Sequence, residues 1–389
     1  MIPLYQSLQG DNAPKTPHKD CHLGLWYTRF FNRYNAQWTL KDTAKQEWVS
    51  SLANKRCGDA TTLEQQTLRL LRLVNALEGQ IAVCKTTWHF ATGLGLPHPV
   101  ENGLAWHPTL GVPFLAGSAM KGLLRAWVEV WDDSLSDEER LQRRRTWFGM
   151  VKGEEGDEQD QAGKLIFFDV IPIEPVGLTA DIMTPHYGKW YEQGHEIKGH
   201  DMATLLQHPE RLPADWHEPV PVPFLAVKHA QFLVAVAARD AKKKELANAA
   251  LESMIAALHW IGAGAKTAAG YGHFVRNETA ENDLRQKQQQ KEEEKKNAAK
   301  KAAKKAQILA ELSSDLEREL HKDLFNAPNQ SIAEANATEW LDKMEKRKAD
   351  EAQEIAGMLK TFYTDIDKWK GGSKKQKEKV KRVKKVLGL

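Results

Sequence analysis

The sequence predicts an α+β protein with a ferredoxin-like core, followed by an α-helical C-terminal extension. The first observation is the order of elements between residues 81 and 276, which is strand, helix, strand, long insertion, strand, helix and strand. The second is that 11 of the 13 tryptophans lie before residue 277, which places the main hydrophobic core upstream. RNA-recognition modules (RRM) use the same split βαβ architecture, but a fold alone does not assign a function.

Each element of the core has its own signature. Alternating or continuous apolar runs predict strands, and the expected strands are residues 81–90, 164–173, 231–238 and 271–276. Apolar residues at helical spacing predict helices over 118–131 and 242–261. The insertion between the second and third strands spans about 174–222.

A change in composition marks the end of the core. Residues 281–305 are mostly Gln, Lys, Glu and Ala, which is typical of an exposed charged helix or linker. Two helical patterns follow, at about 306–325 and 331–369. We therefore expect a core domain over 1–276, a charged linker or helix over 277–305 and a helical extension over 306–389.

The composition is that of a globular protein, with 41% apolar and 28% charged residues in a chain of 389. No run of about 18 apolar residues occurs, which argues against a membrane span. The first ten residues lack a basic segment followed by an apolar run, so secretion is not expected. The cysteines Cys21, Cys57 and Cys84 are too few for a disulfide framework. A cytoplasmic protein is expected.

Charge is unevenly distributed along the chain. Residues 1–276 hold 29 Lys and Arg against 31 Asp and Glu, whereas residues 277–389 hold 26 against 21. The last 22 residues, 368–389, contain ten basic residues and one acidic residue. Such a basic tip favours a phosphate backbone or an acidic partner surface, and a solvated tail without a partner is the alternative.

The segment from His107 to Arg125 is the first candidate phosphate-binding site. Gly117 permits a tight turn, and Ser118 is a natural N-cap for the helix that follows. The free N–H groups and the dipole of a helix start attract phosphate. Lys121 and Arg125 are four residues apart and share one helix face. The alternative is a capped amphipathic helix with two solvated bases.

The second candidate is the glycine-rich loop over residues 262–272, GAGAKTAAGYG. Four glycines around Lys266 suggest a nest of backbone amides that binds anions. A P-loop is excluded because Ala265 and Trp260 occupy its two glycine positions, and Thr267 breaks a dinucleotide-binding fingerprint. A tight structural turn is the alternative.

Together, the two segments resemble the RAMP superfamily of CRISPR effector proteins. The resemblance rests on a Gly-Ser-x-x-Lys-Gly-x-x-Arg helix start at 117–125, paired with a Gly-rich loop after the last core helix. GKLIFFDVIPIEP at 163–175, DIMTPHY at 181–187 and PADWHEPVPVPF at 213–224 are similar to the sixth-subunit family of the type III-B Cmr complex. The resemblance covers about 80–276 and does not include the chain beyond it.

The resemblance implies a non-catalytic subunit that binds the CRISPR guide RNA near its 3′ portion and needs no cofactor. Such a subunit caps a filament of repeating backbone RAMP subunits and contacts a second cap RAMP subunit. The small helical subunit and the target RNA are its other implied partners. The residues expected to hold guide phosphates lie in the two motifs: Gly117, Ser118, Lys121, Arg125, Gly262, Gly264, Lys266, Thr267 and Gly270.

The insertion over 174–222 is the implied thumb-like extension, which separates guide–target base pairs. Met183, His186 and Tyr187 are the residues expected to stack against splayed bases. Trp190 and Tyr191 belong to the same insertion, but for them the favoured interpretation is an anchor of the long loop to the body.

Two other clusters are weaker candidates for metal sites. His18, Cys21, His22 and Cys57 contain the donor atoms of a zinc site, but their spacing matches no compact motif, so no metal is expected. An acidic run is expected to be a solvated loop, with a divalent ion as the alternative. It comprises Glu154, Glu155, Asp157, Glu158 and Asp160.

Two competing functions remain open at this point. The first is a RAMP-superfamily endoribonuclease that processes CRISPR precursor RNA with His89, His98 or His107, although no Ser or Cys nucleophile with a matching acid is evident. The second is mainly an assembly adaptor, in which the C-terminal helices recruit another factor.

We expect no cleavage of target RNA by this chain. In the related backbone subunits, an acidic residue on the loop after the first strand is associated with target cleavage. The matching residues 93–103 contain no aspartate, and their only carboxylate, Glu101, is displaced toward the next segment. A misplaced acid or metal ligand forfeits much of the orientation that in-line attack requires.

Overall fold

The structure is a computed structural model that describes residues 14–41, 43–150, 152–153, 160–197, 206–207, 209–213, 217–311 and 314–389. The chain divides into two compact units, residues 1–288 (unit 1) and 289–389 (unit 2). Among the described helices, none combines the length and apolar character needed to cross a membrane.

The main sheet of unit 1 has the ferredoxin-like strand order β11-β2-β10-β6, with β7 also paired to β10. All of these pairings are antiparallel. The strands are β2 (Gln80–Thr86), β6 (Leu165–Phe167), β7 (Ile171–Pro172), β10 (Gln231–Ala238) and β11 (Phe274–Arg276). The fourth strand of the core lies beside the first, and the third lies between the first and the second, so the predicted fold class is confirmed.

Helices cover both faces of this sheet because side chains alternate along its central strands. Ala82, Cys84 and Phe232 belong to the cluster that includes α4 (Gly117–Ala126) and α8 (Lys244–Trp260). Ile81, Val83 and Leu233 face the opposite way, toward α3 (Ala60–Ala76). Helix α4 continues as a π-helical turn over Trp127–Trp131, so the expected helix over 118–131 is present.

Two expected strands are interrupted. The run 81–90 ends as β2 at Thr86, and the separate strand β3 (His89–Phe90) joins a second sheet. The run 164–173 splits into β6 and β7 because Val170 forms an isolated bridge with Leu115. Between β6 and β7, the carboxylate of Asp169 accepts a hydrogen bond of 2.7 Å from the Gly117 amide at the start of α4.

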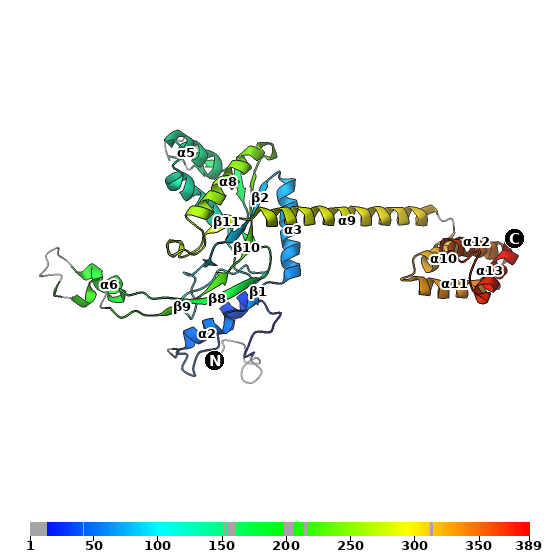
Figure 1. The fold of residues 1–389 in the computed structure, drawn as a ribbon, viewed down its shortest axis with the longest axis horizontal. Helices are drawn as coiled ribbons and strands as arrows, with labels where there is room; N and C mark the ends of the chain where they lie inside the picture. The colour runs from blue at the N-terminus through cyan, green and yellow to red at the C-terminus, as the bar shows by residue number, and fades with distance from the viewer. Residues whose placement is uncertain are drawn as a thin grey trace. The chain divides into compact units, whose positions relative to one another are not determined.

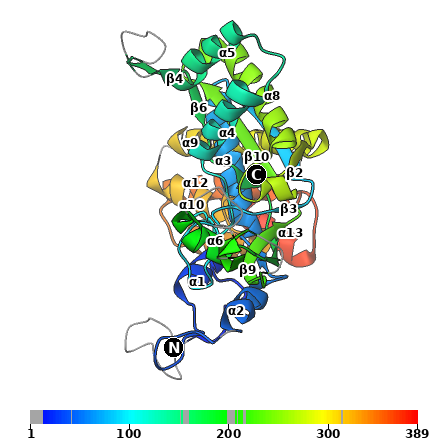
Figure 2. The same ribbon diagram turned by 90° about the vertical axis from the view of Figure 1, so that its left-hand side faces the viewer.

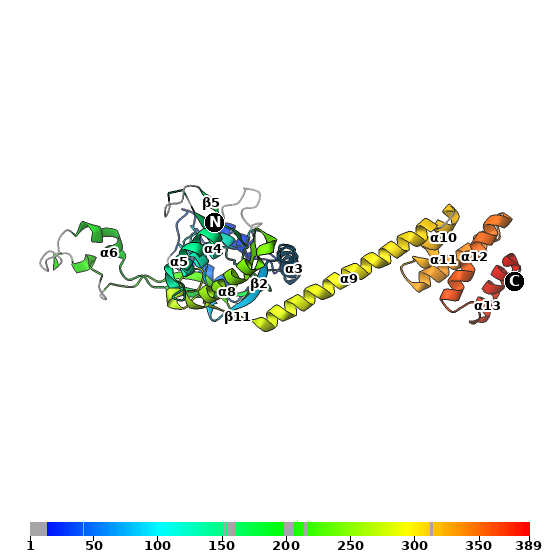
Figure 3. The ribbon, with the colours of Figure 1, turned by 90° about the horizontal axis from the view of Figure 1, so that it is seen from above.

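The second sheet carries the insertion. Its strand order is β1-β8-β9-β3, with β1 (Arg56–Cys57), β8 (Val176–Met183) and β9 (Val222–Lys228). Strands β8 and β9 pair from Gly177↔Lys228 to Met183↔Val222. Figures 1 and 3 show this hairpin leaving the body of unit 1 and carrying α6 (Gly188–Gln193) beyond it. We call the segment 183–222, from the last residue of β8 to the first residue of β9, the thumb.

The remaining elements of unit 1 lie toward its two ends. Helices α1 (Leu23–Arg29) and α2 (Ala44–Leu52) lie at one end, and α5 (Asp137–Arg143) lies at the other with the small pair β4 (Gly149–Met150) and β5 (Gln161–Ala162) (Figures 1 and 2). Helix α2 packs on β8 and β9. No element before residue 81 was expected from the sequence, yet α1, α2 and α3 supply much of the core.

In unit 2, four of the described helices form a bundle around one hydrophobic cluster. The helices are α10 (Asp315–Phe325), α11 (Gln330–Met344), α12 (Ala349–Asp365) and α13 (Lys374–Leu387). Trp340, Leu341 and Phe362 lie in the cluster, and each is at most 2% exposed. The Trp340 indole N–H donates to Asp323 at 2.9 Å.

Helix α9 (Glu278–Glu311) crosses the division between the units, which therefore falls 12 residues later than the expected end of the core. Its first turns pack on unit 1, where Ala280 and Leu284 contact the cluster around α3. Glu281, 6% exposed, pairs with Arg276 at 3.1 Å. These contacts make the start of α9 part of unit 1.

Candidate functional site

The loop between α8 and β11, residues 261–273, has the backbone of an anion nest; we call it the Gly loop. Gly262, Gly264, Lys266 and Gly270 all have positive φ, and Lys266 is left-handed at φ 60°. Within the described residues, the amides of Lys266, Thr267 and Ala268 donate to no protein acceptor. Successive amides that point to one side without a partner form a concavity for anions.

Neighbouring strands fix the Gly loop. The Ala265 amide donates to the Ala91 carbonyl at 2.7 Å, and the Gly272 amide donates to the His89 carbonyl at 2.8 Å. Gly264 and Gly272 pack directly on backbone carbonyls, so a Cβ atom at either position would collide with one. Glycine is therefore required there by space as well as by φ.

His273 ties the ends of the loop together. Its Nδ1 lies 2.9 Å from the His259 carbonyl at the end of α8, and its Nε2 lies 3.1 Å from the Thr267 carbonyl. Carbonyl oxygens only accept, so the ring nitrogen that carries the proton donates to its carbonyl neighbour. His273 belongs to neither of the two motifs seen in the sequence, so no local pattern points to it.

A hollow of about 580 Å³ lies between the Gly loop, the start of α4 and the loop after β3. The Gly loop lines it from Ile261 to Ala265 and at Thr267, and Ala119, Met120 and Leu123 line it from α4. The two sequence motifs therefore meet across one space, as their positions beside the same sheet require.

The charged and capping residues of α4 have other neighbours. Ala116 is the N-cap, and Ser118 is an exposed residue inside the helix, so the predicted capping role of Ser118 is wrong. Asp169 takes over that role by accepting from the Gly117 amide. Capping was assigned from residue type, but the chain turns two residues earlier than the serine.

Lys121 and Arg125 do not line the hollow. The Lys121 ammonium donates to the Phe148 carbonyl at 3.2 Å. Arg125 pairs with Glu129 at 2.8 Å, and Arg144 pairs with the same carboxylate at 2.8 Å. Ala119, Met120 and Leu123 form the face of α4 that lines the hollow. At 3.6 residues per turn, Lys121 and Arg125 project from the opposite side of the helix. Their contact with phosphate stays a prediction.

An aromatic cluster between the Gly loop and the base of the thumb was missed by the sequence analysis. The Lys266 ammonium lies 5.5 Å from the centre of the Phe224 ring, which lies 5.9 Å from that of Tyr271. The Tyr271 hydroxyl donates to Asp181, and burial, followed by this bond and charge, raises the pKa of Tyr271. Trp88 contacts Tyr271 at 4.9 Å. The sequence signal was a tryptophan beside a strand end.

The thumb residues do not act as one group. Met183, at the end of β8, packs partly against the cluster of Phe224 and Tyr271 and so lies near Lys266. His186 and Tyr187 lie at the base of the thumb, where the Tyr187 ring meets that of His217 at 6.5 Å. Tyr191 is 75% exposed and does not anchor the loop, whereas Trp190 packs on Gly194 of its own segment.

The three histidines considered for catalysis have structural contacts. His98 stacks on Tyr27 at 4.1 Å, and its Nε2 contacts the Tyr27 carbonyl at 2.9 Å. His107 accepts backbone amides of its own turn at Nδ1. Burial lowers the pKa of His89, His98 and His107 below the ordinary value, which favours neutral rings.

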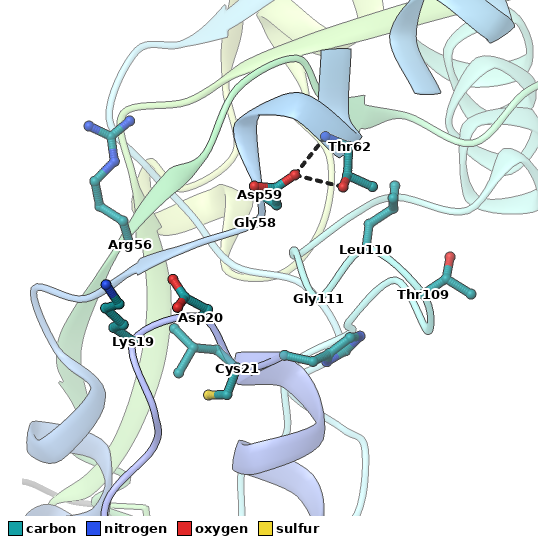
Figure 4. A pocket seen from close by; sticks show the side chains of 12 residues that line it. Lys19, Asp20, Cys21, Arg56, Gly58, Asp59, Thr62, Thr109, Leu110 and Gly111 are labelled. Carbon is teal, nitrogen blue, oxygen red and sulfur yellow. Dashed lines mark hydrogen bonds between the residues drawn. The ribbon is translucent and has the colours of Figure 1, made fainter. Parts of the chain in front are cut away.

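The four zinc candidates form no cluster of metal donors within the described residues. Cys21 and His22 line a pocket of about 470 Å³ with Asp20 and Asp59, and Figure 4 shows Asp59 bonded to Thr62. Those two bonds, both 2.7 Å, cap α3 and lower the pKa of Asp59. Cys57 is buried and its Sγ faces the Val176 carbonyl. The described residues contain no group of three donors that could hold a metal ion.

Two of the acidic candidates lie among the described residues, and each has a partner within the protein. Glu101 pairs with Lys45. Asp160 accepts the Lys152 amide at 2.8 Å. Glu154, Glu155, Asp157 and Glu158 lie outside the described residues.

The basic tip is partly used inside unit 2. Lys368 pairs with Glu334 at 2.6 Å, and Arg382 pairs with Asp342 and Glu345, both at 2.7 Å. Lys379 donates to Thr338 at 2.7 Å. The lysines of α13 that remain exposed are Lys374, Lys375, Lys377, Lys381, Lys384 and Lys385.

Comparisons with known proteins agree with this picture. The family model of the RAMP superfamily matches residues 82–275. The CRISPR system Cmr subunit Cmr6 of Pyrococcus furiosus is 31% identical over 252 residues, which cover 52% of this chain and 69% of that protein.

Two solved structures are also similar in part. The type III-B Cmr-beta complex bound to cognate target RNA contains a chain with a TM-score of 0.43 and 18% identity, matched over 60% of this chain and 71% of that one. The crystal structure of Cmr6 from Pyrococcus furiosus gives a TM-score of 0.29 and 25% identity, over 51% of this chain and 97% of that one. On the sequence matches, this chain belongs to the RAMP superfamily and, within it, to the Cmr6 family of type III-B Cmr subunits.

Proposed function

We propose that this chain is a non-catalytic subunit of a type III-B CRISPR (Cmr) complex and binds the guide RNA through its Gly loop. The observation that carries the proposal is the run of three unpaired amides, Lys266 to Ala268, on a loop held rigid by β3 and His273. An RNA phosphate accepts from such amides, and the Lys266 ammonium adds a positive charge beside them.

The surroundings of the Gly loop support a contact between the bound RNA and the thumb. The base of the thumb, at Met183, lies against the same aromatic cluster as Lys266, so a guide strand on the Gly loop would pass the hairpin. We propose that the thumb, through Met183, His186 and Tyr187, contacts the guide–target duplex. The expected partners are guide RNA, target RNA, the repeating backbone RAMP subunit, a second cap RAMP subunit and the small helical subunit.

The test of RNA binding uses Lys266→Ala with Lys242→Ala as its matched control. Lys242 is exposed at the opposite end of α8, about 25 Å along a helix of 17 residues. Lys266→Ala is expected to weaken guide binding and to reduce the salt dependence by about one unit of slope, whereas Lys242→Ala leaves both unchanged. Equal behaviour of the two variants would remove the phosphate role of the Gly loop.

The same assay tests the α4 cations. Because Lys121 and Arg125 already contact Phe148 and Glu129, each must exchange a protein partner for a phosphate. We expect Lys121→Ala and Arg125→Ala to lower affinity less than Lys266→Ala. A larger loss in either variant would place the main phosphate contacts on α4.

The absence of catalysis has two direct tests. Isolated protein incubated with a CRISPR repeat RNA without metal is expected to leave it intact, and specific cleavage would favour the endoribonuclease alternative. In a reconstituted complex, Glu101→Ala is expected to leave every target cut in place. Loss of one cut with assembly unaffected would show that this subunit takes part in cleavage.

We propose a second role for unit 2, which is to bind RNA nonspecifically through α13. The six exposed lysines of α13 give it a basic surface, which attracts phosphate at low salt. Replacing Lys377, Lys381 and Lys384 together by glutamine is expected to reduce nonspecific RNA binding by the full chain. If binding is unchanged but assembly with the other subunits fails, the surface serves a protein partner and unit 2 is an adaptor.

A further inference from the structure

We propose that the indole of Trp88 is a stacking platform for one unpaired base of the RNA whose phosphate lies on the Gly loop. This inference rests on the proposed function and adds to it a base-contacting residue and a preference for single-stranded RNA.

Trp88 lies in the turn between β2 and β3, and 44% of its surface is exposed. Trp26 and Trp48, by contrast, are 6% and 1% exposed in the core of the same unit. An exposed tryptophan that contributes little to a core is a candidate contact for a ligand.

The indole is nonetheless held in one orientation. It stacks on the His89 ring with a centroid distance of 4.7 Å and an interplanar angle of 18°. Its second neighbour, Tyr271, lies at 4.9 Å and is fixed by its bond to Asp181. Burial lowers the pKa of His89 below its ordinary value, which favours a neutral ring against Trp88. A platform already fixed in place loses little entropy when a base stacks on it.

Trp88 also lies beside the nest. A Cβ atom on Gly270 of the Gly loop would lie 3.8 Å from the Trp88 ring. The turn that carries Trp88 is bonded to the last residue of the Gly loop, because the Thr87 amide donates to the His273 carbonyl at 2.9 Å. The phosphate nest and the aromatic platform therefore form one rigid surface, with Lys266 on the side toward the thumb.

This combination of amides, a cation and an exposed indole fits a nucleotide. Single-stranded RNA is bound by a charged track that holds the backbone and by aromatic rings that stack on the bases. A base inside a duplex already has both faces covered, so only an unpaired base can use Trp88. Stacking does not read the base edge, so we expect little base preference.

The experiment measures RNA affinity of the full chain by fluorescence anisotropy. The probes are a single-stranded oligoadenylate of about twelve nucleotides, an abasic ribose–phosphate oligomer of equal length and an RNA duplex. The variants are Trp88→Ala and Trp88→Phe, with Trp131→Ala as the matched control. Trp131 is 56% exposed and lies 12 residues beyond Ala119 along α4 and its π-turn, about 18 Å away.

Trp88→Ala is expected to weaken oligoadenylate binding roughly 10-fold and leave the salt slope unchanged. Trp88→Phe is expected to keep most of the affinity, and neither variant should alter binding of the abasic oligomer or the duplex. Trp131→Ala should bind all three probes like the parent chain. Circular dichroism melting shows which variants are folded. If Trp88→Ala unfolds, Trp88→Leu takes its place, because leucine keeps apolar bulk but has no aromatic ring, and the same loss of oligoadenylate affinity is expected.

Each contrary outcome has a distinct meaning. If Lys266→Ala lowers the salt slope but both Trp88 variants bind oligoadenylate like the parent chain, the platform is wrong and the proposed function stands. If the parent chain binds none of the probes, both are wrong. If Trp88→Ala keeps RNA affinity and loses assembly with another subunit, the exposed indole contacts protein and not RNA.

Discussion

Unit 1 and unit 2 are stabilised by different kinds of contact. In unit 1, the central pairing of Leu233 with Val83 joins residues 150 positions apart, and burial lowers the pKa of the half-buried His98. In unit 2, four consecutive helices close around Trp340, and ion pairs such as Arg382–Glu345 lie on the outside. The first arrangement requires most of the chain to fold together, whereas the second forms from neighbouring segments. We therefore expect the two units to unfold separately.

The largest effect is expected from Trp340→Ala. The side chain is 1% exposed and its indole is bonded to Asp323, so its removal leaves a cavity and an unpaired carboxylate. A loss of about 3–5 kcal/mol is expected, which is a large share of the total stability of a unit this small. Calorimetry should show that the transition of unit 2 falls or disappears while that of unit 1 stays.

The control for this variant is Ile332→Ala, which truncates a side chain that is 41% exposed on α11. It is expected to shift the transition of unit 2 only slightly. A fall of both transitions in Trp340→Ala would show that the units unfold as one.

The second effect concerns the boundary between the units. Truncation after Gln288 keeps the first turns of α9, whereas truncation after Asn277 removes Leu284, Lys287 and the carboxylate of Glu281 that pairs with Arg276. The shorter chain is expected to be less stable by about 2–4 kcal/mol, from lost apolar burial and a broken, largely buried ion pair. Thermal melts of the two truncated chains measure the difference. Equal melting temperatures would place the end of the core at residue 276.

The third effect is a difference in acid sensitivity. In unit 1, burial holds the pKa of His98 and His107 below the ordinary value of about 6.5, so the unfolded chain binds protons first as pH falls. The contribution of these two histidines to the stability of unit 1 is complete above about pH 6.5 and is lost as the pH falls below that value. In unit 2, hydrogen bonds from Lys368 and Arg382 lower the pKa of Glu334 and Glu345, so that contribution is lost only below about pH 4.5.

Denaturant unfolding of the full chain at pH 7.5, 6.0 and 5.0 measures this difference. Unit 1 is expected to lose stability across the series while unit 2 changes little. His98→Gln should flatten the decline in unit 1, because the buried imidazole is then absent. A steeper decline in unit 2 than in unit 1 would contradict the assignment.

The smallest effect is expected from Arg382→Ala. Its guanidinium bonds Asp342 and Glu345 at 2.7 Å each, but the side chain is 31% exposed. Partly exposed ion pairs contribute about 0.5–1 kcal/mol, and salt screens them. The melting temperature of unit 2 should fall by a few degrees at low salt and converge with the parent at high salt. An unchanged difference at high salt would indicate lost packing instead of lost charge.

Much of unit 1 follows from local patterns. Alternation along β2 and the apolar run of β10 predict strands whatever their partners are, and the helical spacing of α4 and α8 predicts their buried faces. The glycines of the Gly loop likewise predict positive φ, because other residues rarely adopt it. The strand order then follows from the few ways in which such elements can be connected.

The neighbours of the site residues do not follow from local patterns. Ser118 has the right type for a cap, but Asp169, 52 positions from the amide it binds, takes that role. Arg125 shares the Glu129 carboxylate with Arg144, and Trp88 packs against His89 and Tyr271 with 44% of its surface still exposed. A side chain's partners depend on segments brought together by folding, which periodicity in one segment cannot encode.

The sequence by itself determined the central strands and helices of the core between residues 81 and 276, the helical extension and the unusual conformation of the Gly loop, because steric limits on φ and the burial of apolar faces act within a few residues. Only the tertiary structure decided that β3 leaves the main sheet, that unit 1 continues to Gln288, and which amides, cations and rings share one surface. Those outcomes depend on hydrogen bonds and packing between distant segments, whose energies exceed the local preferences wherever the two conflict.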